Sequence, residues 1–132
     1  MVRVSDGDTI IARDSSGSDL GRVRVLGMDA PEMARDGQPA MCGARAAKDE
    51  LARLVQGGTI DLITDPKQPD TDRYGRLLRY VEVDTTDVSE SLIRSGHAPN
   101  TSRGRSHTRY KTYAAAEDDA QRQQRGLWGT CL

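Results

Sequence analysis

A chain of 132 residues is long enough for one domain with a single modest core. Only 36% of the residues are hydrophobic, and no apolar run approaches the ~20 residues that a membrane-spanning helix needs, so we expect no membrane partner. The net charge of −1 excludes binding driven by overall positive charge, but the charge is uneven: residues 1–65 carry 8 basic and 11 acidic side chains, and residues 66–132 carry 11 and 9.

The first part of the chain predicts short strands. Residues 2–4, 9–13 and 21–26 are β-branched or alternating runs, and Ser15-Ser16-Gly17-Ser18 is typical of a hairpin turn between the second and third. Because the first strand begins so early, no signal-like segment precedes it. We therefore expect a mature form, or a chain from which any leader has been removed.

Helices and two further strands follow. Apolar residues from Ala44 to Leu54 recur at helical spacing, and Gly57-Gly58 is expected to end that helix. Strands are predicted at residues 59–64 and 76–83, joined by an exposed, mobile loop with two prolines at residues 65–72. Asp87-Val88-Ser89-Glu90 has the spacing of a capping box that opens a short helix ending at Gly96. A last helix is predicted over residues 108–124.

This order of elements predicts an α+β fold. Five short strands around a helix, with two more helices, indicate a small five-stranded Greek-key β-barrel of the OB-fold type with three helices. No internal repeat or low-complexity segment divides the chain, so residues 1–132 are expected to form one domain.

Two acidic clusters carry the clearest chemical signal. Asp6-Gly7-Asp8 and Asp29-Ala30-Pro31-Glu32 each adjoin a predicted strand, and Arg24 lies just before the second cluster. Carboxylates that converge with an arginine make a poor core but a good site for a hard divalent cation beside a phosphate, because arginine matches a phosphate with two parallel hydrogen bonds. Taken alone, however, the first cluster is also typical of a plain tight turn.

A second signal is a basic run in the latter half of the chain. Between Arg94 and Lys111 no acidic residue interrupts Arg103, Arg105 and Arg109. Such a run is either a solvated loop or a local electrostatic footprint for a polyanion.

The order of three motifs resembles the staphylococcal (thermo)nuclease family. The first runs from Val4 to Thr9, the second from Arg24 to Glu32, and the third is Asp72-Arg73-Tyr74-Gly75-Arg76-Leu77; the ending Arg125-Gly126-Leu127-Trp128 is also similar to many bacterial members. The resemblance covers essentially the whole chain. It implies an OB-fold nuclease, a Ca²⁺-dependent phosphodiesterase that hydrolyses DNA and RNA and leaves 3′-phosphate ends, and it implies a monomer.

The resemblance also implies roles for individual residues. Asp8 and Asp29 match the carboxylates that bind Ca²⁺, Ala30 would add its backbone carbonyl, and Asp6 would hold metal-bound water from the outer shell. Glu32 matches the residue that activates or orients the attacking water.

The remaining implied roles concern the phosphates of the substrate. Arg24 and Arg76 match the pair that binds the scissile phosphate, and Arg73 and Tyr74 match contacts to a neighbouring phosphate. Relatives often carry tyrosines after Gly96-His97-Ala98, whereas this chain has Pro99-Asn100-Thr101-Ser102. We expect the basic run that follows to compensate for these missing stacking residues through phosphate contacts: Arg103, Arg105, Arg109 and Lys111. Alternatively, Tyr110 or Tyr113 could supply the stacking from the last helix.

Cys42 and Cys131 are separated by most of the chain and belong to no Cys-x-x-Cys motif. In a small hydrolase that resembles secreted nucleases, such a pair is expected to form a disulfide, which favours a secreted or extracytoplasmic location. Two free thiols in a cytosolic protein are the alternative.

Two other functions stay open at this point. The domain could be a non-catalytic OB-fold module that binds nucleic acid or protein, or a secreted binding protein with a structural Ca²⁺ site. Against the first, Asp8, Asp29 and Glu32 are all present, as are both arginines of the expected phosphate site. Against the second, a purely structural Ca²⁺ loop has no use for arginines beside the metal.

Overall fold

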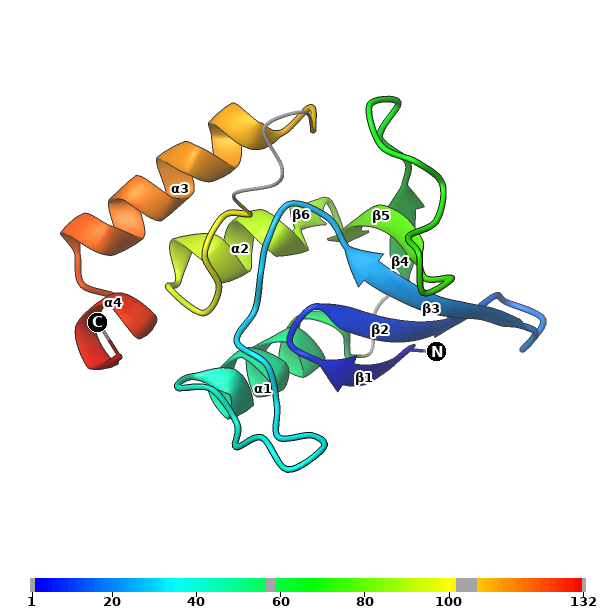
Figure 1. The fold of residues 1–132 in the computed structure, drawn as a ribbon. Coiled ribbons are helices and arrows are strands. Elements are labelled where there is room, and N and C mark those ends of the chain that lie inside the picture. The colour runs from blue at the N-terminus through cyan, green and yellow to red at the C-terminus, as the bar shows by residue number, and fades with distance from the viewer. Residues whose placement is uncertain (1, 57–58, 102–106, 132) are drawn as a thin grey trace.

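The structure, a computed structural model, describes residues 2–56, 59–101 and 107–131. It combines a twisted sheet with helices, of which α2 lies between α1 and α3 (Figure 1). In chain order the elements are β1 (Val2–Asp6), β2 (Thr9–Arg13), β3 (Asp19–Val25), α1 (Ala44–Val55), β4 (Ile60–Ile63), β5 (Leu77–Val83), β6 (Thr86–Asp87), α2 (Val88–Arg94), α3 (Tyr110–Arg122) and α4 (Leu127–Thr130). None of the helices in these ranges is long and apolar enough to cross a membrane.

The strand pairing is that of an open, mixed sheet. The order is β1-β2-β3-β5-β4, with the two-residue β6 paired to β5, and only the β3–β5 pair is parallel. The five predicted strands and three predicted helices are present, and β6 and the short α4 are additions. Within the described residues no pairing joins β1 to β4, so the predicted closure into a barrel is not seen. Strands β1 and β4 are therefore the two edge strands of the sheet. The four residues of β4 all pair with β5.

The core lies between the sheet and the helices because alternate strand residues and one stripe of each helix are apolar. On β2 and β3, Ile10, Val23 and Val25 are fully buried. Helix α1 contributes Ala47 and Leu51. The other large buried side chains are Met28, Tyr80, Val81, Val88, Leu92, Ile93 and Tyr113.

Asp87 begins α2 as the capping-box pattern predicts. Its Oδ1 accepts a hydrogen bond from the backbone N–H of Glu90 at 3.1 Å. The same carboxylate accepts the Tyr113 hydroxyl at 2.7 Å and a guanidinium N–H of Arg109 at 2.8 Å, both from the start of α3. One side chain therefore caps α2 and fastens α3 to it.

The loop predicted to be exposed over residues 65–72 begins with a buried anchor instead. Asp65 is only 4% exposed, and its Oδ2 accepts the Tyr80 hydroxyl at 2.7 Å and the backbone N–H of Thr108 at 2.8 Å. Pro66 and Lys67 are exposed, as predicted. The prediction was wrong for Asp65 because a charged residue is buried when several donors surround it, and these donors come from distant parts of the chain.

A disulfide joins Cys42 to Cys131, with 6.0 Å between the two Cα atoms. It fastens α4 to the segment before α1. At Gly43, where φ is +85°, a Cβ atom would overlap the side chain of Leu127, so glycine is needed for both the turn and the packing. Leu127 is the buried residue of α4.

Loss of this disulfide is expected to lower stability markedly. The bridge closes a loop across a sequence separation of 89 residues. In the chain-entropy model such a loop stabilises the fold by about 4–5 kcal/mol, equivalent to roughly 15 °C in Tm. Thermal denaturation of Cys42→Ser/Cys131→Ser beside the oxidised protein measures the change. Two alkylatable thiols in the native, air-exposed protein would contradict the pairing.

Candidate active site

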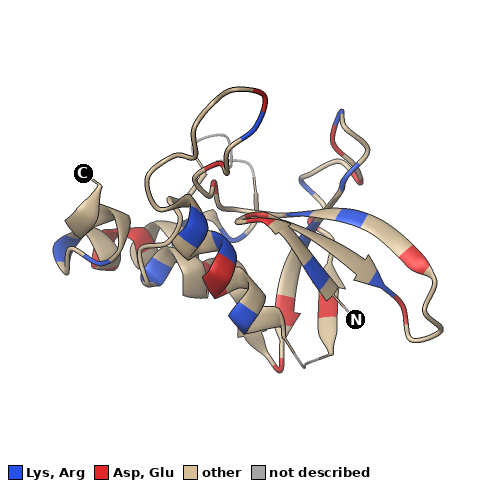
Figure 2. Cartoon of the chain, turned by 90° about the horizontal axis from the view of Figure 1, so that it is seen from below, with Lys and Arg blue, Asp and Glu red and all other residues tan. Residues whose placement is uncertain are grey.

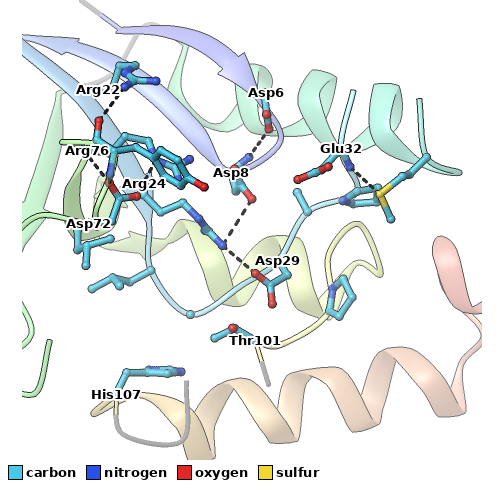
Figure 3. Close-up of a pocket in the computed structure, with 18 of the residues that line it drawn as sticks. Asp6, Asp8, Arg22, Arg24, Asp29, Glu32, Asp72, Arg76, Thr101 and His107 are labelled. Carbon is cyan, nitrogen blue, oxygen red and sulfur yellow. Dashed lines mark hydrogen bonds and ion pairs between the residues drawn. The ribbon is translucent and has the colours of Figure 1, made fainter. Parts of the chain in front are cut away.

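A cleft of about 1320 Å³ lies between the β1–β2 turn, the segment that follows β3, and the turn before β5 (Figure 3). Most of the residues singled out from the sequence line it: Asp6, Asp8, Arg24, Asp29, Ala30, Glu32, Cys42, Arg73, Tyr74, Arg76 and Cys131. Arg103 and Arg105 lie outside the described residues.

Arg24 lies between the two aspartates expected to bind a metal. Its Nη2 is 2.8 Å from Oδ1 of Asp29 and 3.6 Å from Oδ2 of Asp8 (Figure 3). The sheet places Asp8 here because Arg24 pairs with Thr9, the next residue along. Two carboxylates from separate segments thus converge on one cationic nitrogen.

A turn at Gly27 brings Asp29 back toward Arg24. Strand β3 ends at Val25, and Gly27 has a φ of +90°, a conformation that other residues rarely adopt. A Cβ atom at Gly27 would also overlap the ring of Tyr113, which packs directly beneath. Glycine is therefore required at residue 27, where the chain turns and brings the second acidic cluster back toward the first.

The surroundings of Asp8 favour a cation. Burial raises the pKa of the Asp8 carboxyl above its ordinary value, Arg24 opposes this rise, and the nearby Asp6 carboxylate adds to it. Asp6 is close enough for its Oδ1 to accept the backbone N–H of Asp8 at 3.4 Å. A positive charge beside Asp8 stabilises the ionised form that burial disfavours.

The donor chemistry fits a hard divalent cation. Asp8 and Asp29 offer carboxylate oxygens, the ligands that Ca²⁺ and Mg²⁺ prefer, and both ions also accept backbone carbonyls and water. Among residues 2–56, 59–101 and 107–131, no three His, Cys, Asp or Glu side chains are grouped so as to hold a metal by themselves. Arg24 supplies a positive charge between the two aspartates.

The turn before β5 places Arg76 beside Asp72 and Thr9. Its Nε is 2.8 Å from Oδ2 of Asp72, and its Nη1 donates to Oγ1 of Thr9 at 3.0 Å. Asp72 also accepts the backbone N–H groups of Tyr74 and Arg76. Burial alone would raise the pKa of the Asp72 carboxyl, but these donors hold the pKa below its ordinary value. An ionised Asp72 therefore organises the turn that carries Arg76.

Glu32 lies in an irregular segment on the opposite side of the cleft (Figure 3). Its backbone carbonyl accepts the N–H of Met41 at 2.8 Å, and its own N–H lies 3.4 Å from the Met41 sulfur. The carboxylate is exposed and lies 3.5 Å from a guanidinium nitrogen of Arg35, which is itself 3.8 Å from Asp6. Arg35 was not singled out from the sequence, because outside a helix its spacing from Glu32 predicts no contact.

Most of the residues that line this cleft lie in the part of the chain that matches a known family, although Asp6 and Asp8 precede that part and Cys131 follows it. A model of the Staphylococcal nuclease homologue family matches residues 22–130. The chain belongs to the staphylococcal nuclease family. The resemblance drawn from the three motifs is thereby confirmed.

Individual relatives agree with this assignment. The chain is 29% identical over 128 residues to the thermonuclease of Staphylococcus hyicus and 32% identical over 133 residues to that of Staphylococcus intermedius, covering 73% of each. The alignments include 97% and 96% of this chain. It is also 31% identical over 127 residues, 96% of its length, to the SPbeta prophage-derived endonuclease YokF of Bacillus subtilis (strain 168), of which it covers 42%.

In this staphylococcal nuclease family member, Tyr74 stands exposed between two arginines. Its side chain is 58% exposed. The Cζ atom of Arg73 lies 4.9 Å from the centre of the ring and that of Arg76 lies 5.7 Å away, distances at which a cation is attracted to an aromatic face. Tyr74 is therefore a cleft-wall residue rather than a core residue.

Arg109, part of the basic run, is engaged in holding the fold. Its Nη1 is 2.8 Å from Asp87 and 2.9 Å from Glu82, and its Cζ lies 4.3 Å from the centre of the Tyr80 ring. Arg94 at the other end of the run contacts Asp119. These two arginines are thus paired with acidic residues. The sequence did not indicate this, because the acidic partners lie outside the basic run.

His107 lies at the base of the cleft and is 3% exposed. Asp65 is ionised, since the hydrogen bonds of Tyr80 and Thr108 outweigh burial and hold its pKa below the ordinary value. The single Tyr80 hydroxyl proton therefore goes to Asp65, so the Nδ1–H of His107 donates to the Tyr80 oxygen at 2.7 Å. Its Nε2 is then unprotonated and, within the described residues, has no hydrogen-bond partner.

Stability is expected to fall as the pH drops below about 6.5 because of His107. Burial lowers the pKa of the imidazole, so the unfolded chain binds a proton at a higher pH than the folded chain does. The contribution is complete above the unfolded pKa and is lost as the pH falls below it. Urea unfolding between pH 5 and 8 should show a flatter profile for His107→Asn, whose amide can replace Nδ1–H. An unchanged slope would contradict the assignment.

Proposed function

We propose that the protein is a Ca²⁺-dependent nuclease that hydrolyses phosphodiester bonds of DNA and RNA and leaves 3′-phosphate ends. The observation that carries the proposal is the convergence of Asp8 and Asp29 on Arg24 in a cleft that also contains Arg76 and Glu32. Membership of the staphylococcal nuclease family and the names of the thermonuclease relatives support it.

The proposed metal site uses the carboxylates of Asp8 and Asp29 with the backbone carbonyl of Ala30, and Asp6 holds water in the outer shell. When bound there, Ca²⁺ supplies positive charge that offsets the charge gathering on the phosphate oxygens. The position suits a cation because Asp8 is partly buried and has Asp6 as an acidic neighbour.

The remaining roles belong to the arginines and the glutamate. Arg24 and Arg76 hold the scissile phosphate and stabilise the charge that its equatorial oxygens gain in the transition state. Glu32 accepts a proton from the attacking water, which adds to phosphorus while the 5′-oxygen departs. Because the Arg24 guanidinium contacts both aspartates, a substrate phosphate would have to replace part of these contacts.

Activity on polynucleotides is expected to require Ca²⁺ and to disappear in excess chelator. Mg²⁺ should support less turnover even where it binds, since it gives up its water reluctantly and resists a loose, irregular coordination shell. Release of acid-soluble nucleotides from DNA and RNA, with Ca²⁺, with Mg²⁺ and with chelator, measures this. Full activity in chelator would refute the metal site. Binding of nucleic acid without hydrolysis under every condition would instead indicate a non-catalytic OB-fold module.

We also propose an extracytoplasmic location, because a disulfide persists in oxidising compartments and Cys42 and Cys131 are joined.

A further inference from the structure

Charge alone does not show where a polyanion lies on this molecule, because acidic and basic residues are interspersed over the helices and strands (Figure 2). A more selective criterion is which arginines of the cleft lack an acidic partner. Five arginines line the cleft: Arg22, Arg24, Arg35, Arg73 and Arg76.

Three of these arginines are neutralised, and two are not. Arg24 contacts Asp29, Arg35 contacts Glu32 and Arg76 contacts Asp72. Arg22 and Arg73 have no carboxylate within 4.0 Å among the described residues, since neither takes part in any of the ion pairs found there. Both side chains are also exposed to solvent.

Arg22 and Arg73 both contact Tyr74, at opposite ends of the residue. A guanidinium N–H of Arg22 donates to the backbone carbonyl of Tyr74 at 3.0 Å, and Arg73 donates to the Tyr74 hydroxyl at 2.7 Å. Figure 3 shows Arg22 beside the Arg76 and Arg24 group, on the side of the cleft opposite Glu32. Each guanidinium has five N–H donors, so a single hydrogen bond leaves most of them available to a ligand.

The geometry of strand β3 places Arg22 and Arg24 on the same face of the sheet. They are two residues apart on β3, so their side chains point to the same face of the sheet with Cα atoms ~7 Å apart. That separation is comparable with the length of one extended nucleotide. A strand of nucleic acid with one phosphate at Arg24 and Arg76 can therefore present another to Arg22.

We propose that Arg22 is a further phosphate-binding residue of the cleft, which holds a phosphate neighbouring the scissile one in addition to the contacts expected there of Arg73 and Tyr74. The site then recognises a polynucleotide backbone rather than an isolated phosphodiester. This inference rests on the proposed function, because it takes Arg24 and Arg76 as the scissile-phosphate site.

Equilibrium binding in chelator, where no hydrolysis is expected, tests the subsite. Fluorescence anisotropy compares a labelled twelve-nucleotide oligothymidylate with a labelled dinucleotide over a series of salt concentrations. Loss of one phosphate contact to a single strand lowers the slope of log K against log salt by about 0.7, or about fivefold in affinity at 0.1 M salt. We expect Arg22→Gln to lose this much for the longer oligonucleotide and less for the dinucleotide.

Arg3→Gln is the matched control. Arg3 pairs with Ile11, which in turn pairs with Arg22, so Arg3 lies on the same row of the sheet two strands away. It is exposed but does not line the cleft. This variant removes the same charge and is expected to keep the wild-type affinity and salt slope. Equal losses in Arg3→Gln and Arg22→Gln would overturn the subsite, because they would reflect general charge.

Arg22→Lys separates phosphate binding from support of the Tyr74 turn. Lysine keeps the positive charge but not the planar group that reaches the Tyr74 carbonyl. We expect it to retain the salt slope, and a loss equal to that of Arg22→Gln would overturn the proposal. A wild-type protein that binds but never hydrolyses would refute the proposed nuclease, whereas an active wild type with a silent Arg22→Gln would refute only the subsite.

Discussion

Replacement of Glu32 by glutamine is expected to lower kcat by about 10²–10⁴-fold, the usual contribution of a general base. Glutamine has nearly the same shape but cannot accept the proton of the attacking water. The backbone contacts of residue 32 with Met41 do not involve the carboxylate, so the fold should persist. Steady-state kinetics on DNA at saturating Ca²⁺, with circular dichroism of each variant, measure the effect.

Asp36→Asn is the control for charge in this segment. Asp36 is exposed, does not line the main cleft, and has a φ of +46°, a conformation that asparagine also tolerates. This variant should retain wild-type kcat. A wild-type kcat in Glu32→Gln would remove Glu32 from the mechanism, and an equal fall in both variants would mean that the effect is one of general charge.

Replacement of Arg24 or Arg76 by lysine is expected to lower kcat by about 10²–10³-fold, as loss of a transition-state hydrogen-bond donor does elsewhere. Lysine keeps the charge but cannot make the planar two-point contact with phosphate. Because the contact strengthens as charge develops, kcat should fall more than KM rises. Arg79→Lys is the control, since Arg79 lies on β5 but pairs with Asp70 and does not line the cleft.

The two arginine variants should differ in their metal dependence. Arg24 contacts Asp29 and Asp8, whereas Arg76 contacts Asp72 and Thr9. Arg24→Lys is therefore expected to change the Ca²⁺ concentration at half-maximal activity, and Arg76→Lys to leave it nearly unchanged. An unaltered Ca²⁺ dependence in Arg24→Lys would contradict a shared role for Asp8 and Asp29 as metal ligands.

Features of the fold that depend on local patterns were predictable. A β-branched run located β2 at Thr9–Arg13, and the capping-box spacing located the start of α2 at Asp87. The boundaries of the other strands moved by one or two residues. The short α4 was not indicated, because its position depends on the disulfide and on Leu127 packing against Gly43 rather than on its own four residues.

The predictable part of the site was the set of charged residues, and the unpredictable part was their partners. The motifs identified Asp8, Asp29 and Arg24, but not that the arginine would lie between the two acids. Asp65 was assigned to an exposed loop because its partner Thr108 is far along the chain. Such pairings depend on tertiary structure, and no spacing in the sequence encodes them.

The disulfide has a consequence for catalysis as well as for stability. Cys42 directly follows Met41, whose backbone N–H holds the carbonyl of Glu32. The bond to Cys131 therefore restrains the segment that positions the proposed base. Reduction is therefore expected to lower the rate of hydrolysis as well as the stability, because it frees the segment that holds Glu32.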